Sequence, residues 1–236
     1  MNLPHPPRGG RLITGIFALL GMIPQAFATT EIPRGTLSVD RSLVRVGSHS
    51  QLAWQIEYPV GVTDVVDIIP PNIIKPKANL KMRTRVLGAS FQQSTTIFLP
   101  VEVMWSKNNA SWSRVFYGRQ TDVNPTKVVL ETTVVKGDTL NFGGRGYRDK
   151  AWLPLYNTSV ATPNLIMLKN GDMVPSTTPA FQQGLIESFL TPYLAADKKT
   201  VKIGKLDLIL LLELGQTNPK VSGFDLQDLV MLVTFE

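Results

Sequence analysis

Apolar and polar residues alternate with a period of two along much of this chain, a pattern typical of β-strands. The clearest case is residues 52–58, where Leu52, Trp54, Ile56 and Tyr58 occupy every second position. Successive side chains of a strand point to opposite faces of the sheet. This segment is therefore predicted to be a strand with one buried face and one wet face.

Similar runs predict that most of the chain is strand, with glycine, asparagine and proline marking the turns between them. Residues 97–105 and 111–117 are expected to form a β-hairpin with a longer loop. Residues 205–214 are apolar on both faces, which predicts a central strand that is covered on both sides. The remaining predicted strands are 36–39, 43–46, 78–86, 126–135, 139–142, 164–168 and 226–235.

One short helix is predicted at residues 178–190. Thr178 can cap it and Pro179 suits its first position, while Pro192 ends or kinks it. Its apolar residues recur at helical spacing: Phe181, Leu185, Ile186, Phe189 and Leu190. The elements together predict a mainly β fold, an antiparallel β-sandwich with this one helix.

The first 28 residues have the pattern of a signal peptide. Arg8 and Arg11 precede an apolar run at residues 12–23, and Ala26-Phe27-Ala28 follows as an A-x-A site. We expect cleavage after Ala28, which leaves a single β-rich domain at 29–236, with a sub-boundary near 118–126 as the alternative. An uncleaved membrane anchor is the other interpretation, but the run is shorter than the ~20 residues that cross a bilayer.

Composition narrows the function classes. The chain has 236 residues, no cysteine and a formal net charge of +6, and removing the two leader arginines leaves about +4. This mild charge does not suggest a nucleic-acid partner. Disulfides, thiolate metal sites and a lipid-attachment cysteine are excluded. His49, the one histidine after the leader, would have to be the base of any Ser-His-Asp triad, and it is predicted to be a turn residue.

Acidic residues near the C-terminus are the candidates for hydrolytic chemistry. Asp207 and Glu213 lie about 20 Å apart along one strand, too far for a glycosidase pair. Glu213 could instead pair with an acid on a neighbouring strand, such as Asp228. Asp225 and Asp228 flank a turn that could hold Ca²⁺, but the EF-hand spacing is absent. We expect a capped turn there, and no cofactor.

Five basic residues fall on odd positions between residues 75 and 85. In one extended strand they would share a face over about 33 Å and would attract an anionic polymer, such as a sulfated or sialylated glycan. The alternative is a solvated outer face that discourages edge-to-edge aggregation. This basic stripe consists of Lys75, Lys77, Lys81, Arg83 and Arg85.

Aromatic residues are the second binding signal, because exposed rings can stack on sugars. Trp105 lies on the apolar face of its strand and is predicted to be core. The less constrained aromatic residues, the candidates for a sugar platform, are Trp112, Tyr117, Tyr147, Trp152 and Tyr156. The glycines of Gly143-Gly144-Arg145-Gly146 fit no phosphate-binding pattern and are predicted to form a loop.

Two stretches resemble known families. Residues 36–58, TLSVDRSLVRVGSHSQLAWQIEY, resemble the opening of immunoglobulin-like bacterial modules. This implies an immunoglobulin-like N-terminal half, with Trp54 as a core residue. The segments NGDMVPSTTPAF, SFLTPYL, KIGKLDLI and LDLILLLELGQTNPKVSGFDLQDLVMLVTFE resemble a family of exported proteins of Verrucomicrobia-type Gram-negative bacteria. The second resemblance implies an exported globular domain and brings no catalytic residue with it.

Three function hypotheses follow. The leading one is a non-enzymatic protein of the periplasm or cell surface that binds a glycan, in particular an anionic one, or another envelope component. It would have no membrane span after cleavage and no catalytic or metal site. The second is a hydrolase acting on polysaccharide. The third is a subunit of a surface fibre.

Overall fold

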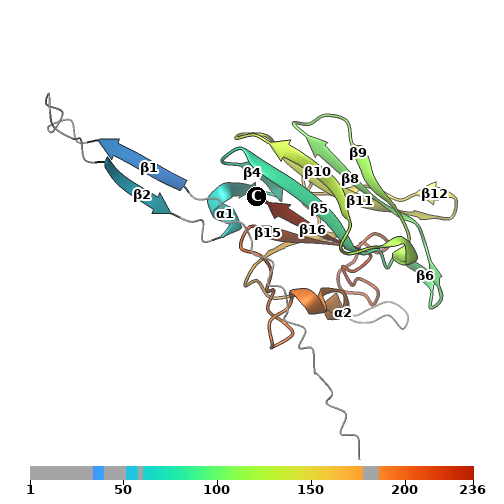
Figure 1. The fold of residues 1–236 in the computed structure, drawn as a ribbon. Helices are drawn as coiled ribbons and strands as arrows, with labels where there is room; N and C mark the ends of the chain where they lie inside the picture. The colour runs from blue at the N-terminus through green and yellow to red at the C-terminus, as the bar shows by residue number, and fades with distance from the viewer. Residues whose placement is uncertain (1–33, 40–51, 58–60, 178–185) are drawn as a thin grey trace, which may run out of the picture.

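A computed structural model describes residues 34–39, 52–57, 61–177 and 186–236. Within them two antiparallel sheets pack face to face, and a two-stranded hairpin projects away from both (Figure 1). The predicted mainly β fold of sandwich type is confirmed. Ala28, His49 and the strand predicted at 43–46 lie outside the described residues.

The larger sheet has seven strands, and its main path runs β3-β4-β11-β8-β9, with β12 and β13 also paired to β11. Its strands β8 and β9 are the predicted hairpin. The bounds are β3 Val66–Ile69, β4 Ile73–Pro76, β8 Val101–Lys107, β9 Ser113–Gly118, β11 Leu140–Arg148, β12 Ala151–Trp152 and β13 Tyr156–Asn157.

The second sheet has five strands in the order β10-β5-β16-β15-β14. Both sheets contain strands from before and after residues 118–126, where the 3-10 helix η2 (Gln120–Asp122) connects β9 to β10. The bounds are β5 Leu80–Gly88, β10 Val128–Val134, β14 Leu165–Lys169, β15 Asp207–Leu212 and β16 Leu229–Phe235.

The main core fills the space between the two sheets. Alternate residues of the strands are buried there, including Met82, Val103, Phe142 and Phe235. Trp105 packs against this core, as predicted. At about 0.8 kcal/mol for each buried CH₂ group, such burial is the main stabilising contribution available to a chain without disulfides.

A second apolar cluster covers the outer face of the five-stranded sheet. Ile186 and Leu190 of α2 (Ile186–Leu190) pack there with Ile209 and Leu211 of β15. Every residue of β15 is therefore buried, which confirms the predicted central strand. The start of the predicted helix lies outside the described residues. Its end turns into the 3-10 helix η3 (Thr191–Tyr193), which contains Pro192.

Three further short elements lie within residues 61–177. The helix α1 (Val62–Val65) leads into β3, and β6 (Gln92–Ser94) pairs with β7 (Ile97–Phe98). No helix of the described ranges has the length and apolar character that crossing a membrane requires.

The loop predicted at residues 143–146 is wrong, because these residues lie inside β11. A Cβ atom on Gly144 would come within 2.3 Å of Leu229 in the opposite sheet, and one on Gly146 within 2.3 Å of Phe91. The glycines therefore allow close packing on the inner face of a strand, and they do not mark a turn.

The predicted core position of Trp54 is also wrong. Among the described residues β1 (Arg34–Val39) and β2 (Leu52–Glu57) pair only with each other, and Trp54 is 67% exposed. The alternation at residues 52–57 does produce a strand, but the structure buries neither of its faces. The immunoglobulin-like N-terminal half is not confirmed.

Candidate functional site

Three aromatic rings, two arginines and a buried carboxylate come together on the seven-stranded sheet. They belong to β8, β9, β11 and β12, which lie side by side (Figure 1). Strand register brings them together, because Glu102 of β8 stands opposite both Tyr117 of β9 and Arg145 of β11. Tyr147 of β11 likewise stands opposite Trp152 of β12. We call this the aromatic–arginine cluster; its members are Glu102, Arg114, Tyr117, Arg145, Tyr147 and Trp152.

Trp152 is the centre of the ring contacts. Its centroid lies 5.1 Å from that of Tyr147 and 6.2 Å from that of Tyr117, with interplanar angles of 64° and 69°. These are edge-to-face contacts, which the charge distribution of aromatic rings favours. Arg145 lies over the Trp152 ring at 4.9 Å, and Arg114 lies over the Tyr117 ring at 5.4 Å.

Glu102 contacts both arginines and holds them in place. Its side chain is 3% exposed, accepts a 2.5 Å hydrogen bond from Arg145 Nε, and lies 3.5 Å from Arg114 Nη1. Each guanidinium group has five N–H donors, so donors remain beyond those that contact Glu102. Tyr117 is 54% exposed and the Arg114 side chain 56%, so a ring and a guanidinium group are open to solvent. With two arginines against one carboxylate, the cluster carries net positive charge.

The structure separates the predicted aromatic candidates into two groups. Tyr117, Tyr147 and Trp152 come together in the cluster. Trp112 is half-buried in the loop before β9, and Tyr156 packs against the main core. Burial, and secondarily the charge of Glu213, raise the pKa of Tyr156.

Sequence reasoning did not find Glu102, Arg114 or Arg145. One signal was present: Glu102 is a single acid between Val101 and Val103, on a strand that is otherwise apolar in its first half. Its arginine partners come from two other strands, and only the register of the sheet identifies them.

The predicted basic stripe does not lie on one strand. Lys75 belongs to β4 of the seven-stranded sheet, whereas Lys81, Arg83 and Arg85 belong to β5 of the five-stranded sheet. Residues 77–79 turn the chain between the two sheets, so the proposed 33 Å row of charges is wrong.

Several charges of the stripe are engaged in ion pairs. Glu131 of β10 lies 2.8 Å from Lys81 and 2.7 Å from Arg83, and Arg83 also pairs with Glu236. Hydrogen bonds from Lys81 and Arg83 lower the pKa of Glu131. Lys77 pairs with Asp67 at 2.9 Å. These acids offset part of the positive charge, and binding by the stripe stays a prediction.

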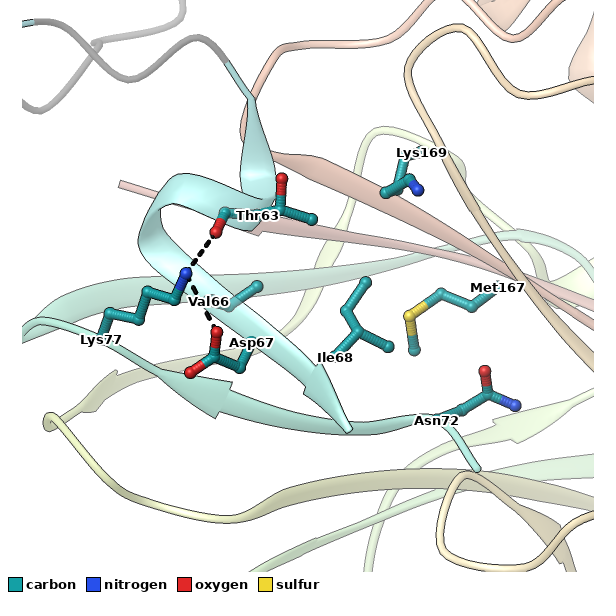
Figure 2. Close-up of a pocket in the computed structure, with 8 residues that line it drawn as sticks. All are labelled: Thr63, Val66, Asp67, Ile68, Asn72, Lys77, Met167 and Lys169. Carbon is teal, nitrogen blue, oxygen red and sulfur yellow. Dashed lines mark hydrogen bonds and ion pairs between the residues drawn. The ribbon is translucent and has the colours of Figure 1, made fainter. Parts of the chain in front are cut away.

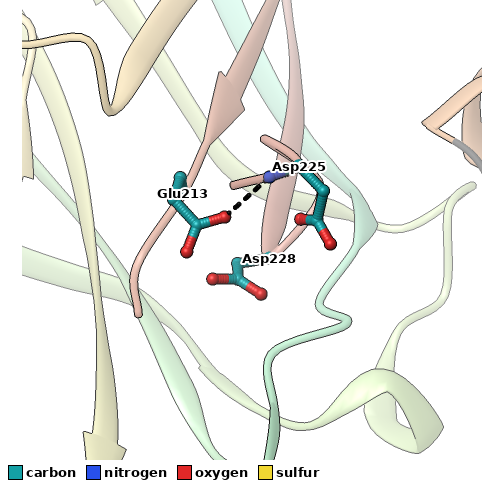
Figure 3. A group of neighbouring side chains, drawn as sticks. All are labelled: Glu213, Asp225 and Asp228. Carbon is teal, nitrogen blue, oxygen red and sulfur yellow. Dashed lines mark hydrogen bonds between the residues drawn. The ribbon is translucent and has the colours of Figure 1, made fainter. Parts of the chain in front are cut away.

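Three buried carboxyl groups meet where β15 ends and β16 begins. Glu213, Asp225 and Asp228 each offer an oxygen within 4.8 Å of the others, and Figure 3 shows the Asp225 N–H donating to Glu213. The predicted approach of Glu213 to Asp228 thus occurs. Burial, followed by the charges of Glu213 and Asp225, raises the pKa of Asp228 well above its ordinary value. The protonated form of Asp228 is therefore favoured.

The backbone around this acidic cluster uses the carboxylate oxygens. Glu213 Oε1 accepts hydrogen bonds from the N–H groups of Gly215 and Gln216, and Asp228 Oδ2 accepts one from Leu214. N–H groups that point at these oxygens compete with a cation for the same lone pairs. None of the three acids lines either of two grooves found among the described residues. The arrangement closes a loop, which agrees with the expected capped turn.

The larger of these grooves lies between β3 and β14 and has a volume of about 440 Å³. Figure 2 shows Lys77 at its rim, where Nζ donates to the Thr63 carbonyl oxygen at 2.6 Å and pairs with Asp67. Ile68 and Met167 are half-buried and supply its accessible apolar surface, Val66 is fully buried beneath it, and the remaining lining residues are polar or charged. We refer to it as the β3–β14 groove.

Comparison with protein-family models, with curated protein sequences and with solved structures finds no match.

Proposed function

We propose that this chain is an exported protein that binds an anionic glycan through the aromatic–arginine cluster. The observation that carries the proposal is the position of Trp152, which is bracketed by two tyrosine rings and lies against Arg145. Such a surface combines apolar ring area with fixed hydrogen-bond donors, the combination that a sugar requires.

The chemistry of a sugar ring matches both parts of the cluster. The C–H groups of a pyranose form an apolar face that can stack on an aromatic ring, while its hydroxyl groups seek donors and acceptors. Arg114 and Arg145 retain N–H groups in a planar fork, which suits a carboxylate or sulfate substituent. Because Glu102 already orients both guanidinium groups, less side-chain freedom is lost on binding.

Export determines which glycans the protein would meet. The leader at residues 1–28 and the resemblance to exported Verrucomicrobia-type proteins support a location in the periplasm or at the cell surface. The candidate ligands there are sulfated or sialylated host glycans and the anionic polysaccharides of the envelope. No catalytic step is proposed.

The test is retention of the purified protein on immobilised heparin, on immobilised mucin and on a neutral glucan. We expect retention on heparin or mucin that salt weakens, and little on the glucan. The variant Tyr117→Ala should elute at lower salt than the wild type. Trp112→Ala is the matched control, because it removes an aromatic residue outside the cluster. Failure of the wild type to bind either anionic matrix would overturn the proposal.

The same columns test the basic stripe. The variant with Lys81, Arg83 and Arg85 all replaced by glutamine should weaken retention less than Tyr117→Ala, since Glu131 and Glu236 already pair with two of the three. A larger loss of retention in the triple variant would indicate that the glycan binds at the basic stripe instead.

A polysaccharide hydrolase is the second candidate, and the approach of Glu213 to Asp228 is the observation that favours it. Glycosidases use carboxyl pairs about 5–10 Å apart that flank the bound sugar. Both side chains are buried here, so a sugar has no access to them in this conformation. Release of reducing ends from mucin or heparin, abolished by Glu213→Gln, would establish the hydrolase instead.

A further inference from the structure

The β1–β2 hairpin has a bare apolar face. Leu37 stands opposite Trp54, and Ile56 lies on the same face two residues further along β2. These side chains are 54%, 67% and 56% exposed. The opposite face carries Thr36, Ser38, Ala53 and Gln55.

Such a hairpin is marginally stable by itself. Two strands need a hydrophobic face packed against something else to persist in water. Among the described residues, β1 and β2 pair with no other strand. Contiguous exposed apolar side chains on a soluble protein mark an interaction surface.

The sandwich offers a matching surface on its open side. β3 ends the seven-stranded sheet and β14 ends the five-stranded sheet, so each has a strand neighbour on one side only. The β3–β14 groove runs between these two edges, and Ile68 and Met167 are its half-buried apolar side chains (Figure 2). At the opposite side of the sandwich the edge strands β9 and β10 contact each other. The open side can therefore accept both apolar side chains and an added strand.

Every copy of the chain carries both the hairpin and the groove, but its own hairpin points away from its own groove. Thr63, at the groove rim, lies six residues after the end of β2, and Figure 1 shows β1 and β2 projecting outward from α1, away from the sandwich. A second copy of the chain is the partner that supplies a hairpin of the right chemistry from outside.

We propose that the β1–β2 hairpin of one copy docks in the β3–β14 groove of the next. Leu37, Trp54 and Ile56 would cover Ile68 and Met167, and a hairpin strand would extend the sheet at β3. The contact joins two different surfaces, so it repeats from head to tail and builds a linear assembly. This assembly is independent of glycan binding and would present the aromatic–arginine cluster many times along its length.

The test is sedimentation velocity of the purified protein over a concentration series. We expect species larger than a monomer, growing with concentration. The donor variant Trp54→Ser should be monomeric, because it removes the largest apolar side chain of the hairpin. The acceptor variant Met167→Lys should also be monomeric, because it replaces an apolar side chain of the groove by a charged one. Circular dichroism of both variants reports whether the sandwich remains folded.

Mixing the two variants decides between assembly modes. Trp54→Ser keeps an intact groove and Met167→Lys keeps an intact hairpin, so an equimolar mixture should form a dimer that cannot grow. Face-to-face contact between two hairpins would instead leave Met167→Lys assembled by itself, and mixing would bring no Trp54→Ser chain into the complex. That result overturns the proposal, as does a wild type that stays monomeric at every concentration.

Tyr117→Ala serves as the control for assembly, because it alters the glycan site and leaves both hairpin and groove unchanged. It should assemble like the wild type. Conversely, Trp54→Ser should still be retained on the anionic matrix. The two proposals can therefore fail separately.

Discussion

The guanidinium carbon of Arg145 lies 4.9 Å from the centroid of the Trp152 ring. The same guanidinium group donates through Nε to the buried carboxylate of Glu102. The ring and the carboxylate together hold the Arg145 side chain in one conformation. This preorganisation is the basis of the proposed glycan site.

Replacing Glu102 by glutamine should loosen the cluster and destabilise the fold. The change removes the buried charge that two arginines contact. The expected loss in the free energy of unfolding is about 1–3 kcal/mol. This is less than the cost of breaking a fully buried ion pair, because both arginines are partly exposed. Urea denaturation measures it. Glu131→Gln, which breaks an exposed pair, is the control and should leave the midpoint nearly unchanged. Equal midpoints for the two variants would contradict the anchoring role.

Adding one carbon atom at Gly144 should be costly. The new Cβ would lie 2.3 Å from Leu229 Cδ2 and 3.3 Å from Leu212 Cδ2, both in the facing sheet. Overpacking of this kind costs about 1–3 kcal/mol. Gly61→Ala is the control, since a Cβ atom there would have no neighbour within 4 Å and the φ of Gly61 is −163°. A neutral Gly144→Ala variant would show that the two sheets are not packed closely at β11.

The acidic cluster should make stability depend on pH. The pKa of Asp228 is raised in the folded state, so its contribution is complete below the unfolded-state pKa and is lost as pH rises through the folded-state pKa. Asp228→Asn removes this titration while keeping an oxygen for the Leu214 N–H group.

The thermal midpoint of Asp228→Asn, relative to the wild type, should therefore rise as the pH increases above about 4, the ordinary pKa of an aspartate. Comparing the variant with the wild type at each pH cancels the titrating groups that do not interact with Asp228, among them Asp207, whose pKa burial also raises. A constant difference across the series would exclude Asp228 as the titrating group.

The proposed export makes a prediction about the N-terminus. The A-x-A pattern predicts that the mature protein begins at Thr29. Intact-mass measurement of the protein from the periplasm or culture medium should show the loss of residues 1–28. A mass that includes Met1, in a membrane fraction, would support the uncleaved anchor.

Alternation and composition were enough to predict the sandwich, because burial between two sheets imposes a period of two on most strands. β15 shows the limit of that rule, since its apolar residues on both faces correctly indicated two covered faces. The same alternation at residues 52–57 predicted a buried face that the structure does not have. A sequence pattern shows which side chains can be buried, but it does not show which part of the chain covers them. Trp54 and its neighbours have no cover within the described part of the chain.

The candidate site was predicted only in part. Tyr117, Tyr147 and Trp152 could be named as free aromatic residues, but Glu102, Arg114 and Arg145 act together only through strand register. The glycines beside Arg145 suggested a loop because sequence does not distinguish a glycine needed for a turn from one needed for close packing. The prediction of a continuous basic stripe was wrong because a short turn at residues 77–79 takes the chain from one sheet to the other.

The most direct test of glycan binding is the affinity of Trp152→Ala for the soluble form of whichever glycan, heparin or mucin glycan, retains the wild type. Titration calorimetry gives both dissociation constants under the same salt conditions. Loss of the central ring should weaken binding at least tenfold, which corresponds to about 1.4 kcal/mol. Equal affinities in the wild type and in a folded Trp152→Ala variant would contradict the account.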